Sequence, residues 1–395
     1  MPRTRSLASL AGVAAVAGAI ALVLSGCVPN SPTAQAETEA IGVTLKDDAC
    51  TVSTATAPSG PITFQVTNAG TTVNEFEVLA EDKLRIAGEK ENIGPGTTVN
   101  YVVQLPEGSF FTACKPGMTG SASHLAPFRV TAGTATPGTA SETARAAQAA
   151  KDYLAYVKDQ TAQLVTATAA FVSAYTSGAD AAARAQYPEA RTYYERIEPT
   201  AEQFGDIDPA LDLREADVET GQTWTGWHRI EKDLWPPAGY TGLDAAGRSQ
   251  LAQQLTADTQ RLHDLVDATT FSLTTDQISN GAVGLMEEVA RTKITGEEET
   301  FSHTDLWDFQ ANVDGADVAY GTVRDIANSK GAAGKQVVRT LDSEFSRITT
   351  LLAKYRSGTG FVPYTALTTA QVKELSDAVN ALSEPLSRLT SIVVG

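Results

Sequence analysis

Cysteine, histidine and methionine are scarce in this sequence: 395 residues contain three cysteines, four histidines and three methionines. A blue-copper site needs two histidines beside its cysteine, and His124 is the one histidine near Cys114, so a standard site of that kind is not supported. No HExxH helix, GxSxG elbow or P-loop lysine motif occurs, which removes the signatures of common hydrolases and nucleotide-binding enzymes.

Basic residues are also fewer than acidic ones. Lysine and arginine total 30 against 47 aspartates and glutamates, for a formal net charge of −17. Such a chain is repelled by phosphate backbones, so we expect no nucleic-acid partner. An acidic surface suits cations, although acidity alone is also a common means of staying soluble.

One long uncharged run occurs, at the N-terminus. Arg3 and Arg5 precede the apolar stretch 7–24, which ends in Leu-Ser-Gly-Cys27. A basic start, an apolar middle and small residues at the cut are typical of a secretory signal. Cys27 in this setting predicts a lipoprotein signal peptide over 1–26, with acylation of Cys27 and a polar tether over 27–39. We therefore expect an exported protein that is lipid-anchored at the outer face of the cytoplasmic membrane; a plain transmembrane anchor is the alternative.

The two remaining cysteines are Cys50 and Cys114. In an oxidising compartment two cysteines most often pair, so a disulfide is expected. Metal ligation by the two thiolates is the alternative.

Residues 40–132 carry a β pattern. Alternating segments such as Ile62–Val66 and Val73–Val78 recur about every ten residues, with turn sequences between them. This spacing predicts an antiparallel β-sandwich. The small, low-complexity segment 133–141 reads as a linker.

From residue 142 to 395 the period changes to that of helices. Ser141 is expected to cap the first helix, whose apolar stripe includes Tyr153, Val157 and Phe171. Further helices are expected at about 180–203, 212–234, 245–272, 275–293, 304–328, 333–356 and 369–392, with no strand among them. The fold class is thus β followed by all-α, with a helical bundle as the second domain.

The segment Gly226-Trp-His-Arg-Ile-Glu231 holds the clearest candidate site. His228 and Glu231 lie three apart and share one face of a helix. An imidazole and a carboxylate so placed are a ready pair of metal ligands, and flanking tryptophans indicate partial burial. The alternative is a simple hydrogen bond between the two side chains at the surface.

Other acidic and histidine side chains are weaker candidates. Glu195, Glu198 and Glu202 fall on one expected helical stripe, and His303 and Asp305 precede or begin another helix. Glu297–Glu299 reads as a solvated loop. In the β half, candidates for a second metal site are Cys50, Glu75, Glu77, Glu89, Glu91, Cys114 and Met118. Their carboxylates favour iron or other divalent ions over copper(I).

These residues resemble a known family. Gly226–Glu231 is similar to the GxHxxE motif of the imelysin-like family, and Tyr194–Pro199 and Glu288–Gly315 resemble flanking blocks of its iron-uptake branch. The resemblance implies a cupredoxin-like domain in front of an imelysin-like helical bundle. It implies iron, Fe³⁺ or Fe²⁺, held by His228, Glu231 and Glu195, with copper or zinc as other metals. It also implies an EfeU-type iron permease and an EfeB-type haem peroxidase as partners.

Three hypotheses follow. The first is an exported iron-binding transport component without turnover. The second is an imelysin-like metallopeptidase, which needs an open metal position and a general base. The third is a copper-assisted ferroxidase step in the β domain, which is compatible with the first.

Overall fold

The computed structural model describes residues 40–395 except 82, 84–85, 119–121 and 134–139. The predicted signal peptide and tether, with Cys27, lie outside the described residues. Within the described ranges no helix is long and apolar enough to cross a membrane.

The N-terminal domain is a β-sandwich of two sheets, with strand orders β2-β1-β4-β7 and β3-β9-β8-β5-β6. The β1–β4 and β3–β9 pairs are parallel and the other pairs are antiparallel. The expectation of an antiparallel sandwich is therefore confirmed except for these two pairs. The strands are β1 (Ile41–Lys46), β2 (Ala49–Val52), β3 (Thr56–Pro58), β4 (Gly60–Asn68), β5 (Asn74–Leu79), β6 (Ile86–Ile93), β7 (Thr98–Leu105), β8 (Gly108–Cys114) and β9 (Ser123–Thr131).

Apolar side chains alternate along these strands and meet between the sheets. Phe64 of β4 packs on Phe76 of β5 and Phe128 of β9, with ring centroids 5.0 and 5.6 Å apart. Cys50 of β2 and Cys114 of β8 are joined by a disulfide, with their Cα atoms 6.0 Å apart. The bridge links the two sheets and leaves neither thiolate free to bind a metal.

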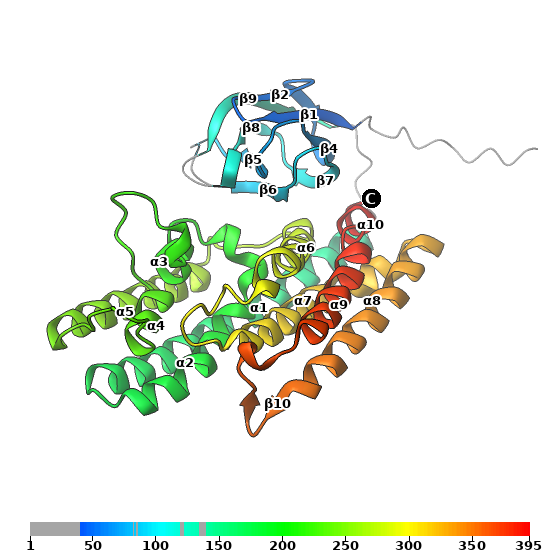
Figure 1. The fold of residues 1–395 in the computed structure, drawn as a ribbon. Coiled ribbons are helices and arrows are strands. Elements are labelled where there is room, and N and C mark those ends of the chain that lie inside the picture. The colour runs from blue at the N-terminus through cyan, green and yellow to red at the C-terminus, as the bar shows by residue number, and fades with distance from the viewer. Residues whose placement is uncertain (1–39, 82, 84–85, 119–121, 134–139) are drawn as a thin grey trace, which may run out of the picture. The chain divides into compact units, whose positions relative to one another are not determined.

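The C-terminal domain is a helical bundle (Figure 1). Helix α1 packs on α2 and α5, and α7 packs on α6 and α8. Its apolar positions form one continuous core. The helices are α1 (Ala140–Thr176), α2 (Asp180–Glu195), α3 (Ile207–Asp212), α4 (Trp227–Leu234), α5 (Ala245–Asp267), α6 (Thr275–Arg291), α7 (Asp305–Ser329), α8 (Gly331–Leu352), α9 (Thr369–Leu386) and α10 (Leu389–Val394).

Three local expectations were wrong. The helix expected over 212–234 is interrupted: α3 ends at Asp212, and α4 begins only at Trp227. The helix expected over 180–203 ends at Glu195 and continues as the 3₁₀ segment η2 (Glu198–Gln203). A two-residue hairpin, β10 (Arg356–Ser357) with β11 (Gly360–Phe361), interrupts the helical half where only a break was expected.

Helix α6 contacts the sandwich at the free edge of β7. The Asp276 carboxylate accepts the backbone N–H of Gln104 at 2.8 Å, and the Asn280 amide donates to the Val102 carbonyl at 2.8 Å. These two side chains lie one helical turn apart and satisfy backbone groups that an edge strand leaves unpaired. The β half and the helical half, from Glu39 to Gly395, form one compact unit.

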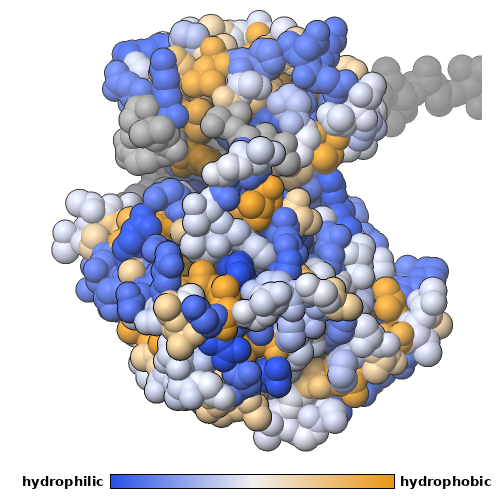
Figure 2. All heavy atoms as spheres, turned by 60° about the vertical axis from the view of Figure 1, so that its left-hand side comes forward, coloured by the Kyte–Doolittle hydropathy of each residue, from blue (hydrophilic) through white to orange (hydrophobic). Residues whose placement is uncertain are grey.

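The surface is largely polar. Among the described residues Leu125, at 39% exposure, is the one large apolar side chain that is exposed. Figure 2 shows apolar residues reaching this face in patches between hydrophilic ones.

Candidate metal centre

Gly226 explains how His228 reaches its place. Its φ of 85° is a left-handed conformation that favours glycine. A Cβ at this position would lie 2.2 Å from the carbonyl oxygen of Leu211. The glycine therefore lets the start of α4 approach the end of α3, which brings His228 next to Asp212.

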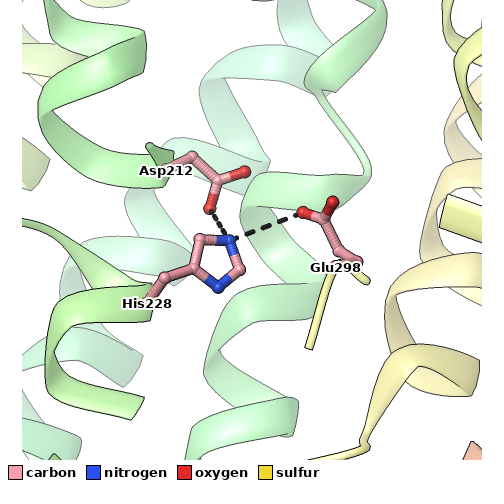
Figure 3. Close-up of side chains that lie close together, drawn as sticks. All are labelled: Asp212, His228 and Glu298. Atoms are coloured by element: carbon pink, nitrogen blue, oxygen red, sulfur yellow. Dashed lines mark ion pairs between the residues drawn. The ribbon is translucent and has the colours of Figure 1, made fainter. Parts of the chain in front are cut away.

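His228 forms a first three-residue group with Asp212 and Glu298. Nε2 of His228 lies 3.4 Å from Asp212 Oδ1 and 3.5 Å from Glu298 Oε1 (Figure 3). His228 is 2% exposed, and this nitrogen has no hydrogen-bond partner. An imidazole nitrogen aimed between two carboxylates, with no hydrogen bond to either, is a suitable position for a metal ion.

The other ring nitrogen faces a second group. Nδ1 lies 3.4 Å from Glu231 Oε2, and Glu299 completes the cluster. The other Glu231 oxygen accepts the backbone N–H groups of Phe301 and Ser302 at 2.9 and 2.6 Å. Those two bonds fix the loop after Glu299 against α4.

Two buried cations lie among the carboxylates. Arg191 of α2 is fully buried and pairs with Glu195 and Asp212, and its Nε lies 2.6 Å from Glu299. Lys293, 3% exposed, lies in the short segment η4 (Lys293–Thr295) and contacts Glu195 at 3.1 Å. Carboxylates outnumber these cations. The surrounding set is Glu195, Glu198, Asp212, Glu231, Glu298, Glu299, Asp305 and Asp308.

Close backbone packing holds η2 in the centre. A Cβ on Gly281 of α6 would lie 1.7 Å from the carbonyl oxygen of Pro199. On the other side, a Cβ on Gly315 of α7 would lie 2.3 Å from the carbonyl oxygen of Arg196, just before η2. Asn312 of α7 donates to Glu195 Oε2 at 2.9 Å and to Glu198 Oε2 at 2.6 Å. Glycine on both helices thus allows this segment to present its carboxylates inward.

The charges in the centre shift one another's protonation. Burial works to raise the pKa of Glu298, but Lys293 and His228 outweigh it and lower that pKa to about 2. Burial and the Arg191 charge oppose protonation of His228, yet the adjacent carboxylates hold its pKa well above the usual range. Burial, reinforced by the Glu231 charge, raises the pKa of Glu299. Carboxylates therefore outnumber the cationic groups Arg191, Lys293 and His228, and part of the cluster takes up protons.

A second acidic group lies in the sandwich. Glu75 and Glu77 share one face of β5, and Glu77 pairs with Glu89 across the β5–β6 ladder. Oxygens of the three carboxylates lie within 4.8 Å of one another. Both oxygens of Glu75, which is 1% exposed, lack a hydrogen-bond partner, and Lys115 is 3.5 Å away. Burial and the Glu75 charge raise the pKa of Glu77 to about 8.

Comparison with known proteins agrees with this architecture. The family model for imelysin matches residues 149–389, and that for the cupredoxin-like domain matches 15–125. The chain belongs to the imelysin family. It is 35% identical over 361 residues to the iron uptake system component EfeO of Yersinia pestis, covering 91% of this chain and 92% of that protein. The identity to EfeO of Escherichia coli (strain K12) is also 35%, over 363 residues and the same shares.

Within this imelysin-family chain, the predicted residues of the helical half lie in several places. His228 and Glu231 lie together in the centre, with Glu195 and Glu198 beside them. His303 belongs to neither metal-competent group; it lines a separate cavity of about 420 Å³ with Trp235 and Phe301.

Two further predicted residues have other surroundings. Asp305 accepts the backbone N–H of Glu299 at 3.1 Å and so supports the loop. Glu202 faces a larger cavity of about 1150 Å³, which Glu75, Glu89 and Glu91 also line.

Sequence reasoning missed Asp212, Glu298 and Glu299. The prediction that Glu297–Glu299 is a solvated loop was wrong, since Glu298 is 3% exposed and Glu299 is fully buried. The loop folds inward because Glu298 and Glu299 face Arg191. One signal was present: Arg191 and Glu195 are four apart, the spacing of a helical ion pair, inside an aromatic segment.

Proposed function

We propose that this chain is the extracytoplasmic iron-binding component of an iron-uptake system, which captures iron in the bundle and passes it to a membrane permease. The names of its relatives support the iron-uptake role. The permease would be of the EfeU type, with an EfeB-type haem peroxidase as companion. Lipid on Cys27 would keep the loaded protein near the membrane.

The excess of buried carboxylate is the observation that carries the proposal. Burying unpaired negative charge is costly. Arg191, Lys293 and His228 offset part of it, and protons taken up by carboxylates such as Glu299 offset more. A divalent or trivalent cation beside His228 would balance the remainder. Carboxylate oxygens with one imidazole suit Fe³⁺ or Fe²⁺ better than soft metals.

The proposed ligands are His228 and Glu231 with the residues that meet them in space, Asp212, Glu298 and Glu299. Glu195 and Glu198 lie one contact further away, on Arg191 and Lys293. His303 and Asp305 were also predicted as ligands. Their hydrogen bonds to the backbone of Glu299 favour a role in supporting the loop over direct ligation.

The group Glu75, Glu77 and Glu89 is the proposed second metal site. Its oxygen donors favour iron or another hard cation over copper(I). Cys50 and Cys114 are bridged and offer no thiolate, which removes a soft ligand that a copper-assisted ferroxidase step would use.

Metal titration of the purified protein tests the proposal. Fe²⁺, Fe³⁺, Cu²⁺ and Zn²⁺ are compared, with His228→Ala as the test variant. His263→Ala is the control, because His263 lies on α5 and in neither group. We expect preferential iron binding with a 1:1 site in the bundle, weakened at least about a hundredfold in His228→Ala and unchanged in His263→Ala.

Two outcomes would overturn it. Zinc-selective binding with peptide cleavage would establish the metallopeptidase alternative instead. Iron binding that survives His228→Ala in a folded protein would remove the bundle centre as the site. Iron affinity should also decline as pH falls, since the ligands bind metal in their deprotonated forms.

A further inference from the structure

Lys293 is an unusual occupant of the bundle centre. Lysine is almost never fully buried unless paired, and this one is 3% exposed. Its Nζ lies 2.6 and 2.7 Å from the two oxygens of Glu198 and 3.1 Å from Glu195 Oε2. All of these contacts are with carboxylates of the metal centre, so the ammonium occupies part of the space in which positive charge is favoured.

The same ammonium reaches a proposed ligand. Nζ is 3.6 Å from Glu298 Oε1, the oxygen that also lies 3.5 Å from His228 Nε2. A metal ion bound between His228 and Glu298 would therefore share an oxygen with Lys293. Two positive charges on one carboxylate repel each other strongly where water is excluded.

The two buried cations differ in how they are held. Arg191 sits within helix α2 and pairs with carboxylates from several elements, including Asp212 and Glu299. A guanidinium with this many fixed partners acts as part of the scaffold. Lys293 is a compact ammonium on a flexible stem, in a three-residue segment that is followed by Gly296, where φ is 79°. Asn312 also bonds Glu195 and Glu198, so these carboxylates keep a partner if the ammonium moves.

We propose that Lys293 competes with the metal for the carboxylates of the bundle centre. This competition sets the affinity of the centre and favours release of the cargo. This inference rests on the proposed function. Without metal, the ammonium compensates Glu195, Glu198 and Glu298. With metal, it is displaced or repelled, which lowers affinity below what the carboxylates alone would give.

Replacing the ammonium by a neutral amide tests the idea. We expect Lys293→Gln to bind Fe²⁺ about 10- to 100-fold more tightly, which corresponds to about 1.4–2.8 kcal/mol. Since the repulsion scales with the charge of the metal, the gain for Fe³⁺ should exceed that for Fe²⁺. The Fe³⁺/Fe²⁺ affinity ratio is a readout that a purely structural lysine would not move. Lys293→Arg keeps the charge and should stay within a few-fold of the parent.

Lys293→Gln leaves buried carboxylates without their cation and can fail to fold. The comparison is then made in the Glu198→Gln background, where the neutral amide replaces the nearest carboxylate: Glu198→Gln/Lys293→Gln should bind about 10- to 100-fold more tightly than Glu198→Gln alone. Unchanged or weaker binding in folded Lys293→Gln, or in Glu198→Gln/Lys293→Gln relative to Glu198→Gln, overturns the inference. Failure of the parent protein to bind iron, or iron binding that survives His228→Ala, would instead sink the proposed function, so the two failures are distinguishable.

Discussion

Asp47 shows how one exposed carboxylate orders a turn. Its two oxygens accept the backbone N–H and the hydroxyl of both Thr71 and Thr72, at 2.7–3.1 Å. These residues connect β4 to β5, the strand that carries Glu75 and Glu77. The side-chain and backbone hydrogen bonds from Thr71 lower the pKa of Asp47 to about 2.

A pH dependence follows from that shift. Because the pKa of Asp47 is lower in the folded state than its usual value of 3.8, its stabilising contribution is present above pH 4 and is lost as pH falls toward 2. We expect Asp47→Asn to be less stable than the parent at pH 6 and to lose less stability between pH 4 and pH 2. Urea unfolding at each pH measures this.

Asp48→Asn is the matched control, since Asp48 is the adjacent exposed carboxylate. Parallel stability curves for Asp47→Asn and the parent below pH 4 would contradict the assignment.

The sequence predicted candidate ligands where two of them lie on one element. His228 and Glu231 lie one turn apart on α4, and period two places Glu75 and Glu77 on one face of β5. Asp212, Glu298 and Glu299 are ligand candidates only because α3 and a loop fold against α4. No periodicity in the sequence predicts that approach. A run of three glutamates is typical of a solvated loop, and only the structure shows that two of them face Arg191.

At the scale of elements, α6 and α7 pack against η2. Helix α6 meets η2 through Gly281, whereas Gly284 on the same helix has open space around it. Long periodic helices such as α6 and α7 were predicted well, because burial of one apolar stripe determines them. The short elements between 196 and 226 were not, because their hydrogen bonds and close backbone contacts determine their conformation.

These two glycines provide a matched pair of substitutions. Gly281→Ala forces a methyl group against the Pro199 carbonyl, so we expect it to destabilise the protein by about 1–3 kcal/mol and to weaken iron binding by displacing Glu198. Gly284→Ala meets no atom within 4 Å and should stabilise by about 0.5–1 kcal/mol. Chemical denaturation and iron titration measure the two effects. Equal stability of both variants would show that η2 is not confined by α6.

At the scale of the whole molecule, the proposed function makes net charge a determinant of how fast iron reaches the site. A charge of −17 attracts free cations, and the attraction is screened over about 30 Å at 0.01 M salt but only about 10 Å at 0.1 M. We expect the association rate of Fe²⁺ to fall about tenfold between 0.01 and 0.3 M salt. Stopped-flow measurement under anaerobic conditions tests this. The dissociation rate should change far less, because the bundle site is buried; an association rate independent of salt would contradict the steering.

The order in which the ligands occur along the chain has a consequence for biosynthesis. His228 and Glu231 are made long before Glu298 and Glu299, and the two halves of the centre meet only when the loop folds onto α4. A nascent chain that ends between them holds an incomplete set of donors. On the proposed function, the full set of donors for iron therefore assembles only at the end of folding.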